Sequence, residues 1–245
     1  MMSTRVTERA AQLRDARVPF VHATVVRAQV PTSAHPGDDA IVLPDGTIEG
    51  FVGGGCAQDP VRAAARDALR TGEAMLLRVL PDGAPEFPDA PGAEVVVNHC
   101  YSGGALEIFL QPVVPPVLVE VVGDTPVAEA VVELAGFLGW VGTRVPPGAV
   151  SGDATAVVVA GQGHGEPEAV RAALAAGVGY IALVASKRRG AAVLDALALP
   201  AADRARVRTP AGLAIGARTA QEVALSIMAE VVAAVRAPGP TRPIR

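Results

Sequence analysis

The second half of the chain alternates apolar runs with helical segments, and this alternation limits the possible folds more than any other feature. Continuous apolar runs occupy residues 117–122, 156–160 and 180–185, and segments with helical periodicity lie at 126–138 and 167–176. Strands that alternate with helices usually form a parallel sheet, and strands buried on both faces appear as continuous apolar runs. We therefore predict an α/β domain with a parallel sheet over residues 117–237.

A capping box marks the start of the last helix in this domain. Thr219 and Glu222 stand three residues apart, as the two partners of such a box do. Apolar residues then recur at every fourth position: Val223, Ile227, Val231 and Val235. A second row on the same helix contains Glu222, Ser226 and Glu230, and we interpret it as a solvated face rather than an interface. Residues 238–245 are expected to form a disordered tail.

Strand-type segments dominate the first half, for which we predict a mixed α/β domain over residues 1–113. The expected strands lie at 20–29, 40–43, 48–52, 75–80, 94–98 and 106–110. The pair Asp45-Gly46 predicts a hairpin turn between the second and third strands. The glycine-rich stretch that precedes the strand at 106–110 is expected to form a turn after the strand at 94–98.

Two helices and a linker complete the predicted first half. One helix is expected at residues 7–16. A second begins at Pro60, which fits a first helical turn with Asp59 as its cap, and ends before Gly72. Residues 111–116 contain three prolines, which remove amide donors and interrupt both helices and central strands. We therefore place the linker between the two domains there.

Charge and composition limit the partners and the compartment. The net charge of −4 gives no long-range attraction to nucleic acid or to an anionic membrane, and no apolar run approaches the length of a membrane span. The first residues include several arginines and no apolar stretch typical of a signal peptide. We expect a cytoplasmic protein whose cysteines are reduced thiols, with a structural disulfide as the alternative.

The two cysteines, Cys56 and Cys100, each lie in a glycine cluster. The first follows Gly53, Gly54 and Gly55, and the second is followed by Tyr101-Ser102-Gly103-Gly104. Glycine allows close approach of the backbone to a ligand, so the two clusters suggest a shared site. A thiol near a helix N-terminus forms a thiolate readily, which suits a nucleophile, a sulfur carrier or a metal ligand. The alternative for Cys56 and Cys100 is a small buried side chain, and the spacing of cysteines and histidines argues against zinc.

Three loops of the second half are expected to meet, because ligands of an open parallel sheet bind beyond the carboxyl ends of its strands. They are Gly123-Asp124-Thr125, Gln162-Gly163-His164 and the loop with Ser186, Lys187 and Arg188. The first opens a helix and the third carries cationic side chains, so together they form a candidate phosphate site. His164 fits either a ligand-binding role or a loop cap.

The dinucleotide fingerprint is incomplete in this half. Gly123 is followed by Asp-Thr-Pro instead of further glycines, and Arg144 stands near the end of the next strand, where an acidic residue would bind a ribose. These departures argue against an ordinary NAD(P) site. An NAD(P)-dependent oxidoreductase of Rossmann type is retained as an alternative function.

Several motifs in a fixed order resemble the XdhC/CoxI family of maturation factors for xanthine dehydrogenase, carbon monoxide dehydrogenase and related molybdenum hydroxylases. In the first half they are PTSAHPG at 31–37, GFVGGGC at 50–56 and CYSGG at 100–104. In the second half they are QGHG at 162–165, TPAGLAIG at 209–216 and EVALSIMAE at 222–230. The resemblance extends over nearly the whole chain and implies a Rossmann-like C-terminal domain.

The resemblance implies a protein that binds molybdenum cofactor, assists its sulfuration by a cysteine desulfurase and delivers it to an apo-hydroxylase. Such a protein is an accessory factor rather than a turnover enzyme. Cys56 and Cys100 would carry sulfur or face the molybdenum. The candidate cofactor-binding residues are Gly53, Gly54, Gly55, Cys56, Gly103, Gly104, Gly123, Asp124, Thr125, Gln162, His164, Ser186, Lys187, Arg188 and Gly212. A scaffold without chemistry is a further alternative, and the sequence neither requires nor excludes a homodimer.

Overall fold

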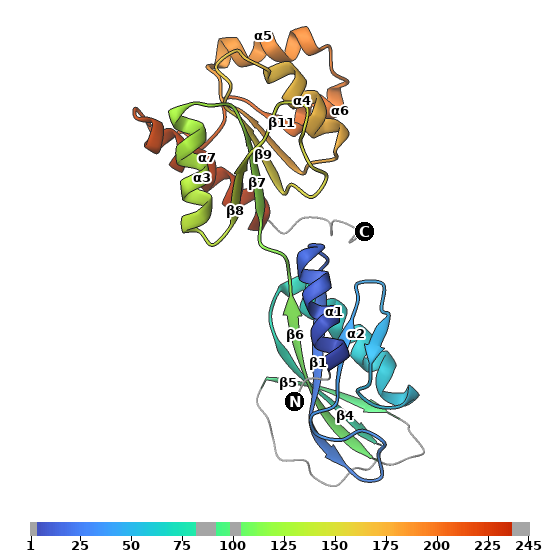
Figure 1. Ribbon diagram of the computed structural model, residues 1–245. Helices are drawn as coiled ribbons and strands as arrows, with labels where there is room; N and C mark the ends of the chain where they lie inside the picture. The colour runs from blue at the N-terminus through green and yellow to red at the C-terminus, as the bar shows by residue number, and fades with distance from the viewer. Residues whose placement is uncertain (1–3, 82–91, 99–103, 237–245) are drawn as a thin grey trace. The chain divides into compact units, whose positions relative to one another are not determined.

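The chain folds into two compact units, whose boundary in the sequence falls at Pro115 and Pro116 (Figure 1). The structure, a computed structural model, describes residues 4–81, 92–98 and 104–236. Within the described residues, no helix combines the length and the apolar character that crossing a membrane requires.

One mixed sheet forms the centre of the first unit. Its strands follow the order β3-β2-β1-β6-β4-β5. Their bounds are β1 (Phe20–Gln29), β2 (Asp39–Val42), β3 (Ile48–Gly50), β4 (Met75–Pro81), β5 (Ala93–Asn98) and β6 (Ala105–Val113). The pairing of β4 with β5 is parallel, and the other pairings are antiparallel. The class is therefore mixed α/β, as the sequence predicts.

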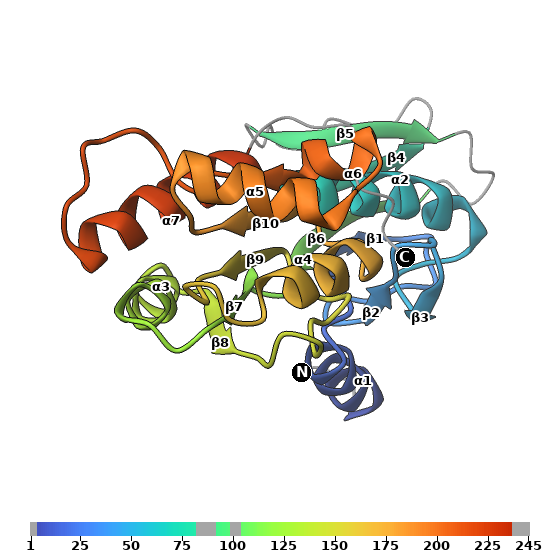
Figure 2. The same ribbon diagram turned by 90° about the horizontal axis from the view of Figure 1, so that it is seen from above.

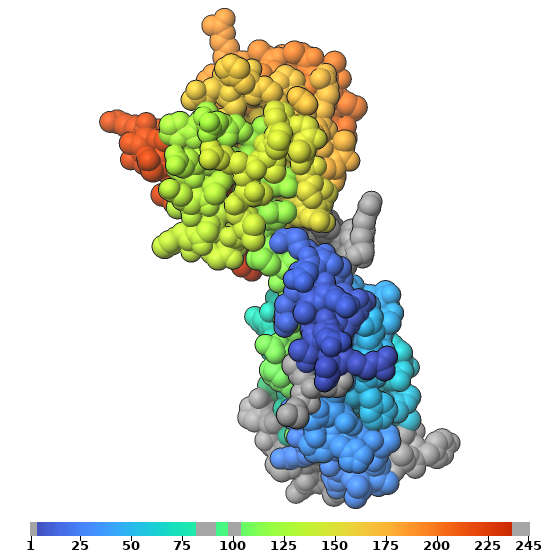
Figure 3. All heavy atoms as spheres, viewed as in Figure 1, coloured from blue at the N-terminus to red at the C-terminus, as the bar shows by residue number. Residues whose placement is uncertain are grey.

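The helices α1 (Thr4–Asp15) and α2 (Gly55–Thr71) cover opposite faces of this sheet (Figure 2). α2 packs Val61, Ala64, Ala65 and Ala68 against strand residues such as Leu77 and Ile108. α1 packs Val6, Ala10 and Leu13 against Phe20 and Ile41. Phe20 and its neighbour Val21 belong to different clusters because successive side chains of a strand point to opposite faces. The outer side of α1 lies at the surface of the unit (Figure 3).

A row of charged side chains crosses the sheet on the face opposite α2. Glu107 of β6 is paired in register with Arg78 of β4 on one side and with Arg27 of β1 on the other. Glu107 Oε1 lies 2.7 Å from Arg78 Nη2, and Glu107 Oε2 lies 3.5 Å from Arg27 Nε. The side chains of Arg78 and Glu107 are 7% and 8% exposed. Three neighbouring strands thus share one nearly buried ionic contact.

The hairpin predicted at Asp45-Gly46 is confirmed. β2 and β3 pair antiparallel, Gly46 has a φ of 88°, and the Asp45 carboxylate accepts a hydrogen bond of 2.8 Å from the Thr47 amide. The predicted strands of this unit are also present, with shifts of a few residues at some of their ends. Strand alternation was a sound guide here because it depends on local sequence alone.

Three details of the first unit differ from expectation. α2 begins at Gly55 and contains Pro60, so the prediction of Asp59 as its cap is wrong. β5 pairs with β4 and not with β6, and the turn expected between β5 and β6 lies outside the described residues. β6 runs to Val113 and includes Pro112. Pairing with β4 ends at Leu110, so the proline lies where β6 has only one neighbour, the position in which a strand tolerates it.

The second unit contains the predicted parallel sheet, in the order β11-β10-β9-β7-β8. The strands are β7 (Leu118–Val122), β8 (Val141–Arg144), β9 (Ala156–Val159), β10 (Tyr180–Leu183) and β11 (Val207–Arg208). After β8 the chain crosses to the other side of β7 and adds β9, β10 and β11 there. The point between β7 and β9 is therefore the topological switch point, where doubly wound sheets bind their ligands.

Helices cover both faces of this sheet. They are α3 (Pro126–Phe137), α4 (Glu166–Ala175), α5 (Lys187–Leu197), α6 (Ala201–Arg206) and α7 (Ala220–Arg236). α3 and α7 bury one set of side chains against the sheet, and α4 and α5 bury another set on the opposite face. Figure 1 shows α3 and α7 to the left of the sheet and α4 to its right. This arrangement makes the second unit Rossmann-like, as expected.

The predicted capping box of α7 is confirmed. The Glu222 amide donates to Thr219 Oγ1 at 3.2 Å, and the Thr219 amide donates to the Glu222 carboxylate at 3.0 Å. Hydrogen bonds from the amides of Thr219 and Arg218 hold the pKa of the Glu222 carboxyl below its usual range. The rest of this row does not form a solvated face: Ser226 is buried, and Glu230 accepts hydrogen bonds from Tyr180 and Gly212.

Residues 186–189, interpreted above as a loop, form the cap and the first turn of α5. Ser186 is the N-cap, and its Oγ accepts a hydrogen bond from the Arg189 amide. α6 and the two-residue strand β11 were not predicted either. Lysine and arginine favour a helix, and the capping serine before them was the signal for a helix start.

Candidate functional site

The Cys56 pocket is a cavity of about 700 Å³ in the first unit. Four segments line it: the loop after β1 at 30–33, the start of α2 at 54–57, the end of β4 at 79–81, and Gly104 and Leu106 at the start of β6. The two motifs that contain residues 31–37 and 50–56 thus contribute to a single cavity. Its size is typical of small-molecule sites.

The start of α2 gives this pocket an anion-binding character. Gly54 is the N-cap, no side chain caps the helix, and no acidic residue occupies its first turn. The first amides of a helix have no intrahelical partner and carry the positive end of the helix dipole. Gly54, Gly55 and Cys56 therefore present a site for a negatively charged group.

Two glycines of the predicted site are required by the backbone. Gly53 has a φ of 129°, and a Cβ at this position would lie 2.9 Å from Ala57 Cβ and 3.0 Å from Leu106 Cδ1. A Cβ on Gly104 would collide with the carbonyl oxygen of Pro31. Gly55, by contrast, has no atom within 4 Å of its missing Cβ. Gly53 and Gly104 thus allow the close packing around the pocket, whereas Gly54 and Gly55 leave open space at the helix start.

Cys56 lies at the second position of α2, close to the helix N-terminus as predicted. It is disulfide-bonded, however, so the expectation of a reduced thiol is wrong for this residue. The expectation rested on the compartment, whereas disulfide formation depends on a distance between cysteines that the sequence does not provide. Cys100 and Gly103 lie outside the described residues.

A second cavity, of about 810 Å³, lies at the switch point of the second unit. The loop at 122–125, the end of β8 with residues 144–147, and the loop after β9 with Gly161, Gln162, His164 and Gly165 line this switch-point cavity. The structure therefore brings together two of the three loops that the sequence predicts to meet.

Gly123 and Thr125 hold the first of these loops in place. Thr125 is the N-cap of α3: its Oγ1 accepts a hydrogen bond from the Ala128 amide and donates one to the carbonyl oxygen of Ala160. Gly123 has a φ of 125°, and a Cβ there would collide with the same carbonyl group. The loop after β7 is thus packed directly against the end of β9.

Charged and polar side chains surround this cavity. Arg144, at the end of β8, forms an ion pair with Asp124, whose side chain is 94% exposed. His164 Nδ1 lies 3.3 Å from the carbonyl oxygen of Gly161, a contact that supports its interpretation as a loop cap. Asp124 was predicted as a site residue from the sequence, whereas its ion pair with Arg144 was not.

Glu166 fixes the loop after β9, and sequence reasoning missed it. This carboxylate is 1% exposed and accepts hydrogen bonds from Arg189 Nη1 at 2.7 and 2.8 Å and from the Gly163 amide at 3.0 Å. Arg189 also donates to the carbonyl oxygen of Val184. A glutamate directly after Gly165, followed by Pro167, was the available signal, because acidic residues favour the first turn of a helix.

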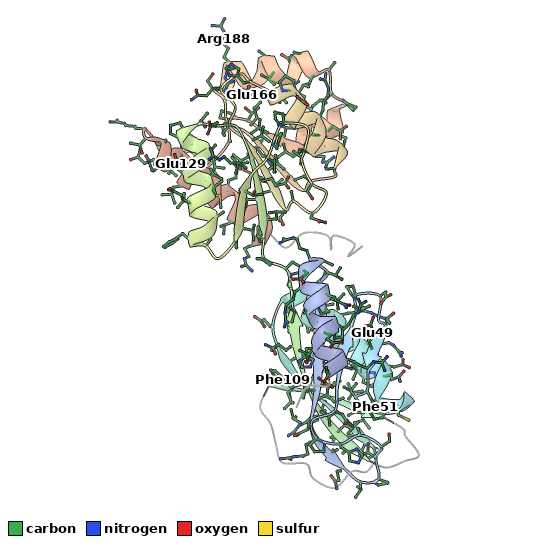
Figure 4. The ribbon with its side chains drawn as sticks, in the orientation of Figure 1. Glu49, Phe51, Phe109, Glu129, Glu166 and Arg188 are labelled. Carbon is green, nitrogen blue, oxygen red and sulfur yellow. The ribbon has the colours of Figure 1, made fainter. Side chains whose placement is uncertain are left out.

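The other predicted residues of this unit lie elsewhere. Ser186, Lys187 and Arg188 are exposed at the start of α5 and do not line the switch-point cavity. Figure 4 shows the Arg188 side chain pointing outward from the unit. Gly212 lies against α7, where its amide donates to Glu230 at 2.7 Å. Among the residues that the structure describes, no three His, Cys, Asp or Glu side chains are grouped in a way that could hold a metal ion.

These features define a two-unit α/β protein with a cysteine-lined pocket in its first unit and a Rossmann-like second unit. Residues 13–79 match the model of the XdhC and CoxI family, and residues 119–231 match that of the XdhC Rossmann domain. The chain belongs to the XdhC/CoxI family.

Two individual proteins are similar to the chain at lower levels. The uncharacterized protein YqeB of Escherichia coli (strain K12) is 25% identical over 91% of this chain. The chain spans only 45% of the length of that relative. A crystal structure described as a xanthine dehydrogenase (BH1974) from Bacillus halodurans superposes with a TM-score of 0.45 at 15% identity, over 95% of this chain and 96% of that one.

Proposed function

We propose that the protein is an accessory factor for a molybdenum hydroxylase and that the Cys56 pocket receives molybdenum cofactor as cargo. The observation that carries this proposal is the pocket itself, which combines a cavity of about 700 Å³, an uncapped helix N-terminus and Cys56 in its wall. Membership of the XdhC/CoxI family supports the choice of cargo and of client enzyme.

The pocket has a place for each end of a phosphate-bearing pyranopterin. Side chains of Val79, Leu80 and Leu106 form an apolar wall against which a flat ring system can pack. The amides at Gly55 and Cys56 suit the phosphate, since a helix N-terminus binds such groups without a cationic side chain. The hydroxyl groups of Thr32 and Ser33, on the opposite loop, provide polar contacts.

The role of Cys56 depends on its oxidation state. A thiolate is the form that binds metal or attacks a sulfur donor, and the disulfide-bonded Cys56 offers none. The proposal therefore requires reduction of this disulfide, with a dithiol as the donor of two electrons and two protons, before sulfur from a cysteine desulfurase is accepted. In this scheme the pocket binds the pterin and phosphate in either state, and the thiol chemistry belongs to the reduced protein.

Substitution of Gly54 tests the anion site without removing a contact. A Cβ at this position has no neighbour closer than Ser33 Oγ at 4.0 Å, and the φ of −69° suits any residue. Both Asp and Asn are favoured at an N-cap, so Gly54→Asp and Gly54→Asn should fold equally well. Only Gly54→Asp adds a negative charge where the phosphate would bind.

The measurement is the amount of molybdopterin that the full-length protein retains through gel filtration, with thermal unfolding of each variant as a control for folding. We expect Gly54→Asp to bind roughly tenfold more weakly than Gly54→Asn, through repulsion between the carboxylate and the phosphate. Equal retention by the two variants would refute the pocket as the phosphate site.

A scaffold that bridges partner proteins without handling the cofactor is distinguished by Cys56→Ser. In reduced protein, we expect this variant to retain molybdopterin but to lose activation of a co-expressed apo-hydroxylase. A scaffold would retain no molybdopterin and would activate equally well with either residue at position 56.

A further inference from the structure

We propose that the switch-point cavity of the second unit binds an adenine nucleotide that carries a 2′-phosphate, and that Arg144 selects this phosphate. This site is separate from the cargo pocket proposed above and does not depend on it. The sequence departs from an ordinary NAD(P) site in two ways, because no further glycines follow Gly123 and no acidic residue stands at the end of the second strand of the unit. The residue found there instead favours a phosphorylated relative of NAD.

The position of Arg144 in the sheet supports this assignment. Arg144 is the last residue of β8, which lies beside β7, and the loop of Gly123 follows β7 in the same cavity. In doubly wound folds the side chain at this point faces the adenosine ribose: a carboxylate binds the 2′-hydroxyl group, and an arginine accepts a 2′-phosphate. A guanidinium group matches phosphate oxygens with two parallel hydrogen bonds.

The walls of the cavity suit the rest of such a nucleotide. Val145, Pro146 and Pro147 directly follow Arg144 and line the same space, so they offer an apolar surface for the adenine ring. Gly123 and Gly161 cannot carry a side chain without colliding with neighbouring carbonyl groups. The backbone is therefore close-packed at the switch point, and the cavity of about 810 Å³ lies directly outside it.

Asp124 forms the ion pair with Arg144 that the proposed 2′-phosphate would replace. Its carboxylate pairs with Arg144, and both side chains are largely exposed, at 94% and 52%. Exposed ion pairs contribute little to stability, so a phosphate dianion can displace Asp124 from the guanidinium group. Of the other charged side chains near the cavity, Glu166 is committed to Arg189, and His164 can add a further donor. Removal of the Asp124 charge should then strengthen phosphate binding.

The test is a fluorescence titration of the full-length protein with NADPH and NADH, in the absence of molybdopterin. Competition with adenosine 2′,5′-bisphosphate and with ADP, which has both phosphates at the 5′ position, identifies which phosphate is recognised. For the wild-type protein we expect NADPH to bind about tenfold more tightly than NADH. The 2′,5′-bisphosphate should be the better competitor by a similar factor.

Three substitutions complete the design. Arg144→Gln should abolish the preference for NADPH, and Asp124→Asn should increase the affinity for NADPH several-fold. Arg204→Ala is the matched control, because Arg204 is 41% exposed, pairs with Asp195 and does not line the cavity; its preference should equal that of the wild-type protein. Absence of saturable NADPH binding, equal affinities for the two dinucleotides, or a preference that survives Arg144→Gln would each overturn the proposal. None of these outcomes bears on molybdopterin binding in the first unit.

Discussion

Glu107 is a nearly buried charged residue at the centre of the sheet of the first unit. Its carboxylate lies between Arg78 and Arg27 on neighbouring strands, and it is 8% exposed. Removal of one partner from a buried ion pair leaves an uncompensated charge in a medium that solvates it poorly. The arginine of β4 would then remain buried without its carboxylate.

We predict that Glu107→Ala lowers the free energy of unfolding by about 3 kcal/mol. Asp67→Ala is the matched control, because Asp67 forms an ion pair with Arg70 on the surface of α2, where both side chains are more than half exposed; its effect should stay below about 0.5 kcal/mol. Urea denaturation measures both. If the two variants lost similar amounts of unfolding free energy, burial of the Arg78–Glu107 pair would not increase the cost of breaking it.

Tyr180 is a buried polar side chain of the second unit, as Glu107 is of the first. Its side chain is largely buried, and its hydroxyl group donates a hydrogen bond of 2.8 Å to Glu230, which also accepts one from the Gly212 amide. Burial, followed by the hydrogen bond and the charge of Glu230, raises the pKa of Tyr180 far above its usual range. The neutral phenol is therefore the form that the folded unit prefers.

This shift predicts a loss of stability in alkaline solution. Because the folded pKa exceeds the unfolded one, the contribution of Tyr180 is fully present below the unfolded pKa, near 10, and declines as the pH rises above it. Tyr180→Phe should cost about 1 kcal/mol at neutral pH and should flatten the decline above pH 10. Denaturation at a series of pH values checks this, and an unchanged slope in the variant would assign the alkaline loss to other groups.

At the scale of elements, the entry to α2 depends on which glycine is replaced. Gly53 combines a φ of 129° with neighbours at 2.9 and 3.0 Å from a missing Cβ, whereas Gly55 is helical and has open space around it. The two positions lie two residues apart in the same cluster. Substitution at Gly53 therefore tests the backbone conformation of the turn, and substitution at Gly55 tests the first residue of the helix.

We predict different effects on stability for alanine at these two positions. Gly53→Ala should destabilise the protein by about 1–3 kcal/mol, because the strained backbone and the contacts with Ala57 and Leu106 must shift. Gly55→Ala should be neutral or should stabilise by up to about 1 kcal/mol, as alanine favours a helix. Thermal denaturation of the two variants decides the matter. Destabilisation by Gly55→Ala comparable with that of Gly53→Ala would contradict the distinction.

Elements were predictable from the sequence where local pattern determines them. The strand at Phe20–Gln29 and the capping box of α7 depend on residues close together in the chain. Which strands lie side by side is not determined by residues close together in the chain. The place of β5 beside β4 follows from packing across the sheet. The start of α2 was predicted too late in the chain because proline is common in first helical turns. Here about one helical turn precedes Pro60.

The site was predictable to a similar extent. The loops at Gly123 and His164 meet because both follow parallel strands, and that rule needs only the order of elements. The loop after β1 and the start of α2 both line the Cys56 pocket. The sequence motifs of both segments were identified, but their proximity was not predicted. The disulfide of Cys56 and the pairing of Glu166 with Arg189 depend on distances in space, which no local pattern contains.

For the whole molecule, the important property is that each unit has its own core. The clusters of the first unit contain residues up to Val113, and those of the second begin at Val117. The segment between them, at 114–116, has neither helical nor strand structure. Two cores of this kind should fold without each other.

A protease site inserted between Val114 and Pro115 tests this independence. After cleavage we expect both fragments to keep their far-ultraviolet circular dichroism and to unfold cooperatively when separated. The midpoint of each fragment should match one of the transitions of the intact chain. Loss of cooperative unfolding in either fragment would show that one unit relies on the other.

The row formed by Arg27, Glu107 and Arg78 also fixes the alignment of three strands during folding. A shift of one residue between β6 and its neighbours would turn Glu107 toward α2, into the cluster that contains Leu77, and would turn Ile108 out of that cluster toward the opposite face. Charged groups are costly in such surroundings, so misaligned sheets are strongly disfavoured. Since Gly104 and Leu106 of the same strand line the Cys56 pocket, the ionic row on one face of the sheet determines where the cavity on the other face is built.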